Sequence, residues 1–176
     1  MRSVQLELTV PDRSAVEAYT TLADFRRYPE FASAVRSVTV TEATAGSTIS
    51  RWEVNFRAGV LCWVEEDTFD PDRNHIDFRQ LEGDVAIFEG SWTCTDTADG
   101  AQIMFMADLD MGIPTLADAL EPIAVRTLVD NTQAIVSGLF GGTPRLGNVT
   151  VGVPAARQAP AARQAPVLAS LSAAAA

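Results

Sequence analysis

The sequence predicts an α+β fold in which a seven-stranded antiparallel sheet wraps around one long C-terminal helix, with two short helices after the first strand. Apolar and polar residues alternate with a period of two in seven segments between residues 4 and 110, and turn clusters separate the last six of them. The stretch that follows has helical spacing of its apolar residues. A sheet of this length can bury its concave face only by wrapping around that helix.

The N-terminal elements are a strand and a helix. Residues 4–10, "VQLELTV", alternate as a strand does, and the period changes in "PDRSAVEAYTTLADF". In this second segment Ser14 and Glu17 have the spacing of a capping box, which predicts that a helix begins there. A second short helix or turn follows in "DFRRYPEF", and we expect Pro29 to end it.

Six further strands form the rest of the predicted sheet. They are separated by turn clusters such as "ATAGS", "RAG" and "DPDRN", so consecutive strands are expected to pair as an antiparallel meander. The predicted strands are residues 35–42, 47–56, 60–69, 75–81, 85–95 and 101–110.

The long helix is predicted within "TLADALEPIAVRTLVDNTQAIVSGLFGG", which two glycines close. Pro122 either begins the main helix at its first turn or kinks a longer helix that starts near Thr115. Residues 1–142 therefore form the predicted domain. In residues 143–176 the hexapeptide "AARQAP" occurs twice before an alanine-rich terminus, and we expect this Ala/Pro/Arg/Gln segment to be a disordered tail.

Composition excludes several classes of function. The formal net charge of the 176 residues is −10, which argues against binding to nucleic acid or to anionic membranes. All 13 basic residues are arginine, which excludes Schiff-base chemistry, a pyridoxal phosphate anchor and a P-loop lysine. No apolar run approaches the length that spans a bilayer, so no membrane insertion is expected.

Residues that commonly bind metals or act as nucleophiles are few. His75 is the only histidine, and in "DPDRNH" we expect a solvated turn residue, which argues against a catalytic triad or a zinc site. Cys62 and Cys94 lie in separate predicted strands without C-x-x-C spacing. We expect both to be reduced thiols in a cytoplasmic protein that uses no metal and no cofactor.

One predicted strand, "LCWVEEDTFDP" (residues 61–71), combines a tryptophan with several carboxylates. With a period of two, one of its faces carries Leu61, Trp63, Glu65, Asp67 and Phe69. At least one carboxylate therefore points where the large apolar side chains point. If "RAG" is a tight hairpin, Trp52 joins that face, whereas Glu66 and Arg51 point outward and are expected to form a surface ion pair.

Four segments carry a resemblance to a known family. They are "LADFRRYPEF" after the first helix, "CWVEEDTFDP" and "FEGSWTCTDTADGAQIMFMADLDM" in the sheet, and "VDNTQAIVSGLF" in the long helix. Across residues 1–142 the chain resembles the START-like (helix-grip, SRPBCC) family of polyketide aromatase/cyclases, which is related to coenzyme-Q-binding lipid carriers. The resemblance implies a deep cavity between sheet and helix, in which the aromatase/cyclases fold a reactive poly-β-keto chain.

The resemblance also implies roles for single residues. Tyr28 stands where the family usually has a tryptophan beside the cavity entrance, Trp63 matches a cavity tryptophan, and Asn131 matches a polar residue of the long helix. Further candidates for substrate contact, for which packing in the core is the alternative, are Trp52, Phe88 and Phe105.

The chain departs from the family at three positions. Asp67 stands in place of a cavity arginine, Glu65 in place of a serine two residues earlier, and Val35 in place of a cavity tyrosine. The proton-transfer set of the best-known family members is therefore not present.

Glu65 and Asp67 are the candidate catalytic residues. Two positions apart on one strand face, they lie about 7 Å from each other, and an apolar cavity raises the pKa of one or both. Such a pair can enolise a β-keto substrate and protonate a departing hydroxyl, which are the steps of aldol cyclisation and dehydration. The alternative for Asp67, close to the strand end, is a solvated side chain or one bonded to the turn.

Two functions follow, and both use the same cavity. The first is a polyketide aromatase/cyclase of secondary-metabolite or antibiotic biosynthesis that needs no cofactor. The second is a non-catalytic carrier of a quinone, lipid or polyketide intermediate. The ligand is a hydrophobic small molecule or polyketide in both cases, and acyl carrier protein or other polyketide synthase components are candidate partners. The acidic pair favours the enzyme, whereas the missing arginine and tyrosine favour the carrier.

Overall fold

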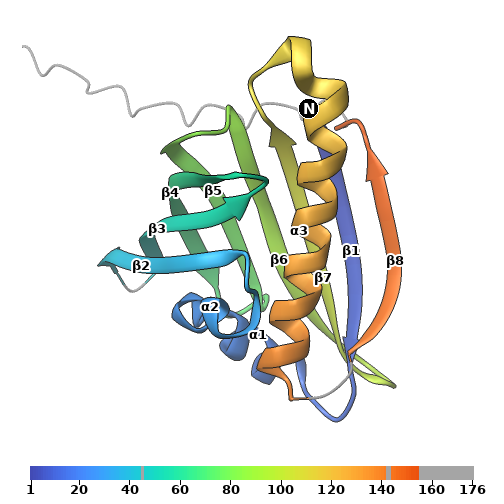
Figure 1. Ribbon diagram of the computed structural model, residues 1–176. Coiled ribbons are helices and arrows are strands. Elements are labelled where there is room, and N and C mark those ends of the chain that lie inside the picture. The colour runs from blue at the N-terminus through green and yellow to red at the C-terminus, as the bar shows by residue number, and fades with distance from the viewer. Residues whose placement is uncertain (45, 142–143, 155–176) are drawn as a thin grey trace, which may run out of the picture.

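The computed structural model describes residues 1–44, 46–141 and 144–154, and in this part of the chain eight strands form a single sheet (Figure 1). The strands are β1 (Arg2–Val10), β2 (Val35–Ala43), β3 (Ser47–Phe56), β4 (Gly59–Asp70), β5 (His75–Gly83), β6 (Ile87–Thr97), β7 (Gly100–Asp110) and β8 (Arg145–Gly152). Their order across the sheet is β2-β3-β4-β5-β6-β7-β1-β8, and every neighbouring pair is antiparallel. The predicted α+β fold class is confirmed, with one strand more than expected.

Two short helical segments follow β1. They are α1 (Ala15–Leu22), and a 3₁₀ turn (Phe25–Arg27) that continues into α2 (Tyr28–Phe31). The capping box of α1 is confirmed, since the Ser14 hydroxyl accepts from the Glu17 amide at 3.3 Å and the Glu17 carboxylate accepts from the Ser14 amide at 2.8 Å. The expectation for Pro29 is wrong, because this residue lies in the first turn of α2, where its missing N–H leaves no bond unmade.

The long helix α3 (Ala117–Leu139) follows a second 3₁₀ turn (Pro114–Leu116). Pro122 lies inside α3, so the longer of the two predicted helices is the one that forms. Pro122 is exposed, and the carbonyl group that loses its N–H partner can therefore bond to water. No helix in the described part of the chain has the length and hydropathy needed to cross a membrane.

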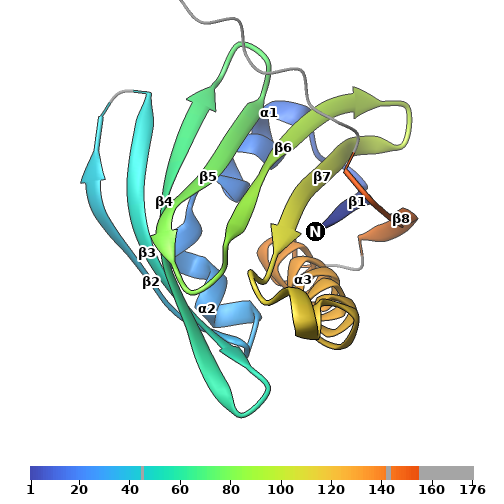
Figure 2. The ribbon, with the colours of Figure 1, turned by 90° about the horizontal axis from the view of Figure 1, so that it is seen from above.

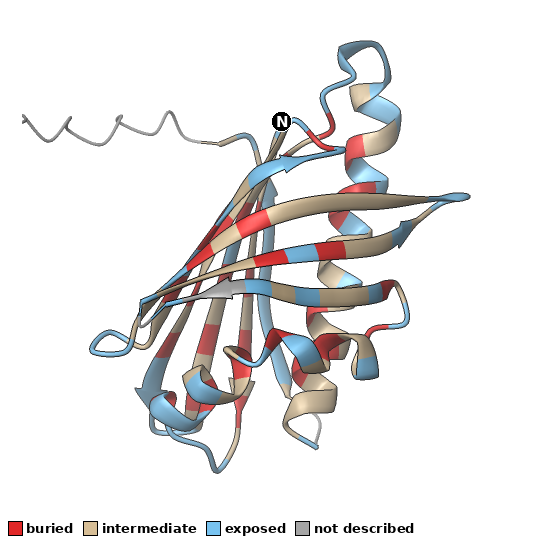
Figure 3. Ribbon diagram, turned by 90° about the vertical axis from the view of Figure 1, so that its left-hand side faces the viewer, coloured by how far each residue is buried: buried red, intermediate tan, exposed pale blue. Residues whose placement is uncertain are grey.

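The sheet curves around α3 (Figure 2), and the core lies between them. Along β1 the alternate residues Val4, Leu6, Leu8 and Val10 are buried, as a strand with one covered face requires. Buried positions recur along the other strands and on α3 (Figure 3). Near the end of α3 the helix backbone approaches α2 so closely that a Cβ on Gly138 would lie 2.2 Å from the Phe31 ring. Only glycine fits there, and the contact fixes α2 against the helix.

The eighth strand lies in a segment for which the sequence predicts a disordered tail. β8 pairs with β1 at the outer margin of the sheet (Figure 1), with Val151 opposite Val4 and Val149 opposite Leu6. The pairing satisfies backbone groups of β1 that would otherwise be unpaired at the margin, which gives β8 a structural role. The remainder of the predicted tail, residues 155–176, lies outside the described residues.

Deletion of residues 145–176 should lower the stability of the protein, because it exposes the backbone of β1. We expect the melting temperature to fall by at least about 4 °C, which corresponds to roughly 1–2 kcal/mol for a chain of this size. Deletion of residues 155–176 alone is the matched control and should change the melting temperature by no more than about 1 °C. Equal melting temperatures of the two truncated proteins would show that β8 does not stabilise the sheet.

Candidate functional site

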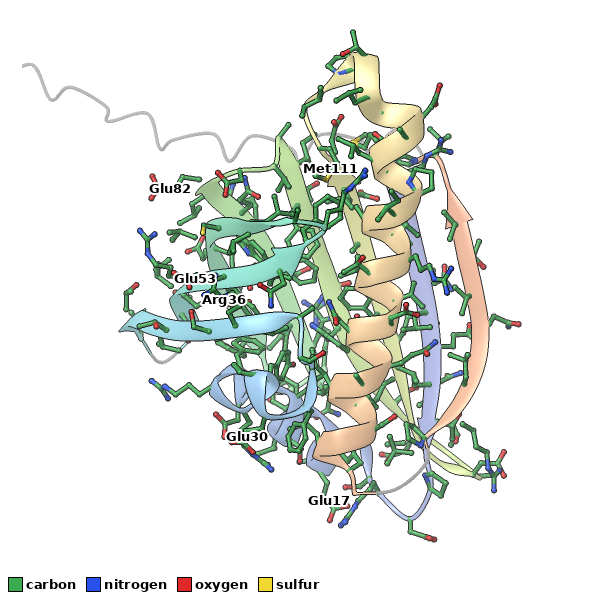
Figure 4. All side chains as sticks on the ribbon, viewed as in Figure 1. Glu17, Glu30, Arg36, Glu53, Glu82 and Met111 are labelled. Atoms are coloured by element: carbon green, nitrogen blue, oxygen red, sulfur yellow. The ribbon has the colours of Figure 1, made fainter. Side chains whose placement is uncertain are left out.

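A cavity lies between the concave face of the sheet and α3. Its volume is about 130 Å³, and the total empty space, counted with the solvent at its opening, is about 940 Å³. Met111, labelled in Figure 4, lines it beside the upper part of α3. The aromatic residues of its wall are Phe25, Tyr28, Trp52, Phe56, Trp63, Phe78, Phe88, Trp92 and Phe105. From α3 it is lined by Ala124, Thr127, Leu128, Asn131, Thr132 and Ile135.

The cavity brings together all eight side chains that the sequence singles out. They are Glu65, Asp67, Trp63, Trp52, Tyr28, Phe88, Phe105 and Asn131. Four of them, Trp52, Trp63, Glu65 and Asp67, come from the hairpin of β3 and β4, in which Trp52 lies opposite Trp63 and Ser50 opposite Glu65. The expected register of the "RAG" hairpin is therefore confirmed.

Two stacked indoles form the flat wall of the cavity. The rings of Trp52 and Trp63 are nearly parallel, with an interplanar angle of 4° and 5.7 Å between centroids. Phe88 meets the Trp63 ring edge-on at 5.5 Å, and Phe25 lies 6.0 Å from the Trp52 ring. Contacts of this kind hold the indoles in place, so that each indole N–H has a fixed direction.

Glu65 is buried beside these rings, with 4% of its surface exposed. The Trp63 Nε1–H donates a hydrogen bond of 2.6 Å to the Glu65 Oε2 atom. Burial raises the pKa of Glu65 well above its usual value, and the neighbouring charge of Asp67 raises it further, whereas the indole hydrogen bond opposes both effects. Burial in this cavity therefore favours the protonated form of the Glu65 carboxyl group.

Asp67 is also buried, with 1% of its surface exposed, so the alternative of a solvated Asp67 is wrong. Its Oδ2 atom accepts a hydrogen bond of 3.2 Å from the Ser50 hydroxyl, which in turn accepts one of 2.9 Å from the Trp52 Nε1–H. Burial raises the pKa of Asp67 to about 7, and the hydrogen bond from Ser50 limits the increase. Near neutral pH, Asp67 thus exists in both protonation states.

Ser50 is the site residue that sequence reasoning missed. It is completely buried, and it connects the Trp52 indole to the Asp67 carboxyl group. A signal was present, because Ser50 lies two residues before Trp52 and therefore on the same strand face.

Glu66, which lies between the two buried carboxyl groups in the sequence, points away from the cavity. The expected ion pair between Glu66 and Arg51 is wrong, because β5 places Arg79 directly opposite Glu66, and the Arg79 Nη2 atom lies 3.3 Å from the Glu66 Oε2 atom. Arg51 is exposed, and the register of β3 and β4 places it opposite Val64 and not opposite Glu66.

Two polar groups of the wall differ in their availability to a ligand. The Tyr28 hydroxyl donates to the Leu22 carbonyl oxygen at 2.7 Å, so its ring faces the cavity while its proton is engaged. Asn131 is partly buried, and its side chain has no hydrogen-bond partner among the described residues. The Asn131 amide can therefore bond to a ligand.

The histidine and the cysteines lie outside the cavity lining. His75 begins β5 instead of lying in the turn, with its Nδ1 atom 2.8 Å from the Thr93 hydroxyl and its Nε2 atom 3.2 Å from the Asp77 carboxylate. Both cysteines are free thiols, and burial raises the pKa of Cys94 to about 12. In the described residues, no three potential metal ligands cluster.

Comparison with known proteins gives a family and a fold. The family model for polyketide cyclase/dehydrase and lipid transport matches residues 12–136. A search of curated protein sequences found no significant match.

Solved structures share the fold at low sequence identity. The protein TTHA0849 from Thermus thermophilus aligns with a TM-score of 0.72 and 22% identity over 79% of this chain and 94% of its own. The Zhui aromatase/cyclase from Streptomyces sp. R1128 has a TM-score of 0.65 and 20% identity over 80% and 92% of the two chains. A STAR-related lipid transfer protein from Xanthomonas axonopodis has a TM-score of 0.62 and 18% identity over 79% and 86%.

Neutralisation of Asp67 should stabilise the protein at high pH. Because burial raises the pKa of Asp67 from 3.8 to about 7, the folded chain binds more protons than the unfolded chain between these values. The contribution of Asp67 to the free energy of unfolding is therefore most favourable below pH 4 and is lost as the pH rises to about 7. We expect Asp67→Asn to raise it by roughly 1–4 kcal/mol at pH 8 and to change it little at pH 4.

Urea unfolding of both proteins at the two pH values measures this difference. Glu66→Gln is the control on the outward face and should change the free energy of unfolding by less than about 1 kcal/mol at either pH. An Asp67→Asn protein that is equally destabilised at both pH values would mean that the pKa of Asp67 is not raised in the native protein.

Proposed function

The chain belongs to the polyketide cyclase/dehydrase and lipid-transport family, and on this basis we propose that it is a polyketide aromatase/cyclase that acts through acid and base side chains of its cavity. The observation that carries the proposal is the pair of buried carboxyl groups, Glu65 and Asp67, at the end of an otherwise apolar, aromatic cavity. A cavity that only stores an apolar molecule has no need of two buried acids, which are costly to keep there.

The surroundings of the two carboxyl groups suit them to opposite roles. Burial raises the pKa of Glu65 well above its usual value, which makes Glu65 the proton donor, and the pKa of about 7 makes Asp67 the base. Asp67 removes a proton from the methylene group between two keto groups, and the resulting enolate carbon attacks a third carbonyl carbon. Glu65 protonates the oxygen of that carbonyl, which yields a hydroxyl group.

Loss of this hydroxyl forms a ring double bond, and enolisation of the remaining ring keto groups then completes the aromatic ring. In the first step Asp67 has taken a proton from the substrate and Glu65 has given one to it, so Glu65 is now ionised and Asp67 is protonated. Glu65 removes the remaining proton beside the new bond, Asp67 protonates the departing hydroxyl, and water leaves, which restores both starting states. The flat ring produced in this way matches the stacked indoles of Trp52 and Trp63.

The hydrogen bonds within the site support this assignment. Among the described residues, Trp63 holds one oxygen of Glu65 and Ser50 holds one oxygen of Asp67. The second oxygen of each carboxyl group is thereby directed to the substrate. Asn131 on α3 provides an amide for a keto oxygen on the opposite wall.

A non-catalytic carrier is the second candidate. The wall residues that support it are apolar, since Val35 stands where the related enzymes have a tyrosine and the Tyr28 hydroxyl is engaged with Leu22. Such a carrier would hold a quinone, lipid or polyketide intermediate by apolar contact. If the protein is an enzyme, we further propose that it acts in the cytoplasm. Its partners would then be acyl carrier protein or other polyketide synthase components.

Glu65→Gln should separate the two functions. The variant keeps the shape of the side chain and removes its proton, so we expect the rate of cyclisation by a reconstituted polyketide synthase to fall by about 100-fold or more. Glu66→Gln on the outward face of the same strand is the matched control and should keep the wild-type rate.

A carrier gives the opposite pattern. Glu65→Gln would then leave ligand affinity nearly unchanged, whereas Trp63→Ala would weaken binding by about 10-fold through loss of apolar contact. If Glu65→Gln yields the same cyclised product at the wild-type rate, the acid/base proposal is wrong.

A further inference from the structure

The acidic end of the cavity has no positive charge of its own. Glu65 and Asp67 are 4% and 1% exposed, and none of the residues that line the cavity is basic. In the described part of the chain, no arginine or histidine forms an ion pair with either carboxyl group. Arg51 and Arg79, on the two strands that flank β4, are on the outward face.

The other ionisable groups that face the pair do not supply a cation either. Tyr28, from α2, donates its hydroxyl proton to the Leu22 carbonyl oxygen. Glu66 and Asp24 add only negative charge to the surroundings. An ionised carboxylate in this position lacks a counter-ion, which is costly in an apolar environment.

The aromatic wall has the same electrostatic preference. The rings of Trp52, Trp63, Phe25 and Phe88 line the same cavity; the Trp63 N–H edge points to Glu65, and the faces of aromatic rings attract cations. Ring faces and carboxyl groups thus both favour a positive group, and both disfavour a carboxylate, sulfate or phosphate. A cation on the ligand would complete the ion pair that the protein leaves incomplete.

We propose that this cavity also binds a ligand that carries a protonated amine on an aromatic or polycyclic body, with the ammonium group between Glu65 and Asp67 and the body stacked on the indoles of Trp52 and Trp63. This inference goes beyond the proposed function, because an ammonium group in that position occupies the acid/base pair; it requires binding alone and no turnover.

Three probes of nearly equal shape test the inference. Naphthylmethylamine, naphthylmethanol and naphthoate, of the same ring isomer, present a cation, a neutral hydroxyl group and an anion on one apolar body. We expect calorimetry at neutral pH to show the amine binding at least about 10-fold more tightly than the alcohol, with naphthoate weakest. Because the ammonium favours the ionised carboxylates, the amine should also release protons to the buffer, and the alcohol should release none.

Substitutions test whether Glu65 and Asp67 cause the preference for the amine. The amine should lose its advantage over the alcohol, to within about 2-fold, in a protein with Glu65→Gln and Asp67→Asn together, and should keep it in Glu66→Gln. Equal affinities of amine and alcohol for the wild-type protein, or absence of binding by all three probes at millimolar concentration, would overturn the inference without use of any variant.

The outcome is distinguishable from a failure of the proposed function. Equal affinities together with a loss of cyclisation in Glu65→Gln would overturn the amine inference and leave the cyclase intact. A strong preference for the amine, together with unchanged cyclisation in Glu65→Gln, would support the amine inference and overturn acid/base catalysis.

Discussion

In the hairpin of β3 and β4, Trp52 pairs with Trp63, and the whole acidic end of the cavity depends on this register. Because side chains alternate between the two faces of a strand, a slip of one residue would turn Glu65 and Asp67 outward and bring Glu66 inward. The observed register places Ser50 opposite Glu65, within reach of Asp67. It also stacks the two indoles, so that both indole N–H groups have acceptors inside the cavity.

The cavity itself exists because α3 is packed against the sheet near its two ends. Towards its C-terminal end, Ile135 and Val136 belong to the main core, and near its N-terminal end Ala124 packs with Leu109 and Met111. Between these contacts the helix lines the cavity with Thr127, Leu128, Asn131 and Thr132, and the strands supply large aromatic rings. Rings that meet one another edge-on or stacked cannot collapse to fill the remaining space, which keeps the carboxyl pair next to an open volume.

Much of this arrangement could be predicted from local patterns. Alternation gave the strands, and a period of two put Glu65 and Asp67 on the face of Trp63. What could not be predicted depends on distant pairing. The burial of Asp67 depends on partners on both sides, with Thr48 of β3 and Phe78 of β5 opposite it, so that Asp67 lies within the sheet and not at its margin. The partner of Glu66 is supplied by β5, and β8 exists because β1 offers it an unpaired margin. None of these pairings can be identified from the sequence of the single strand concerned, because the partner lies in another segment.

The central claim is that two carboxyl groups in an aromatic cavity retain at least one proton at neutral pH. Carbon-13 NMR titration of the Glu65 and Asp67 carboxyl resonances, assigned with the Gln and Asn variants, measures this directly. The structure predicts a midpoint near pH 7 for Asp67 and a midpoint well above its usual value for Glu65. Midpoints near pH 4 for both groups, as in an unfolded chain, would contradict it.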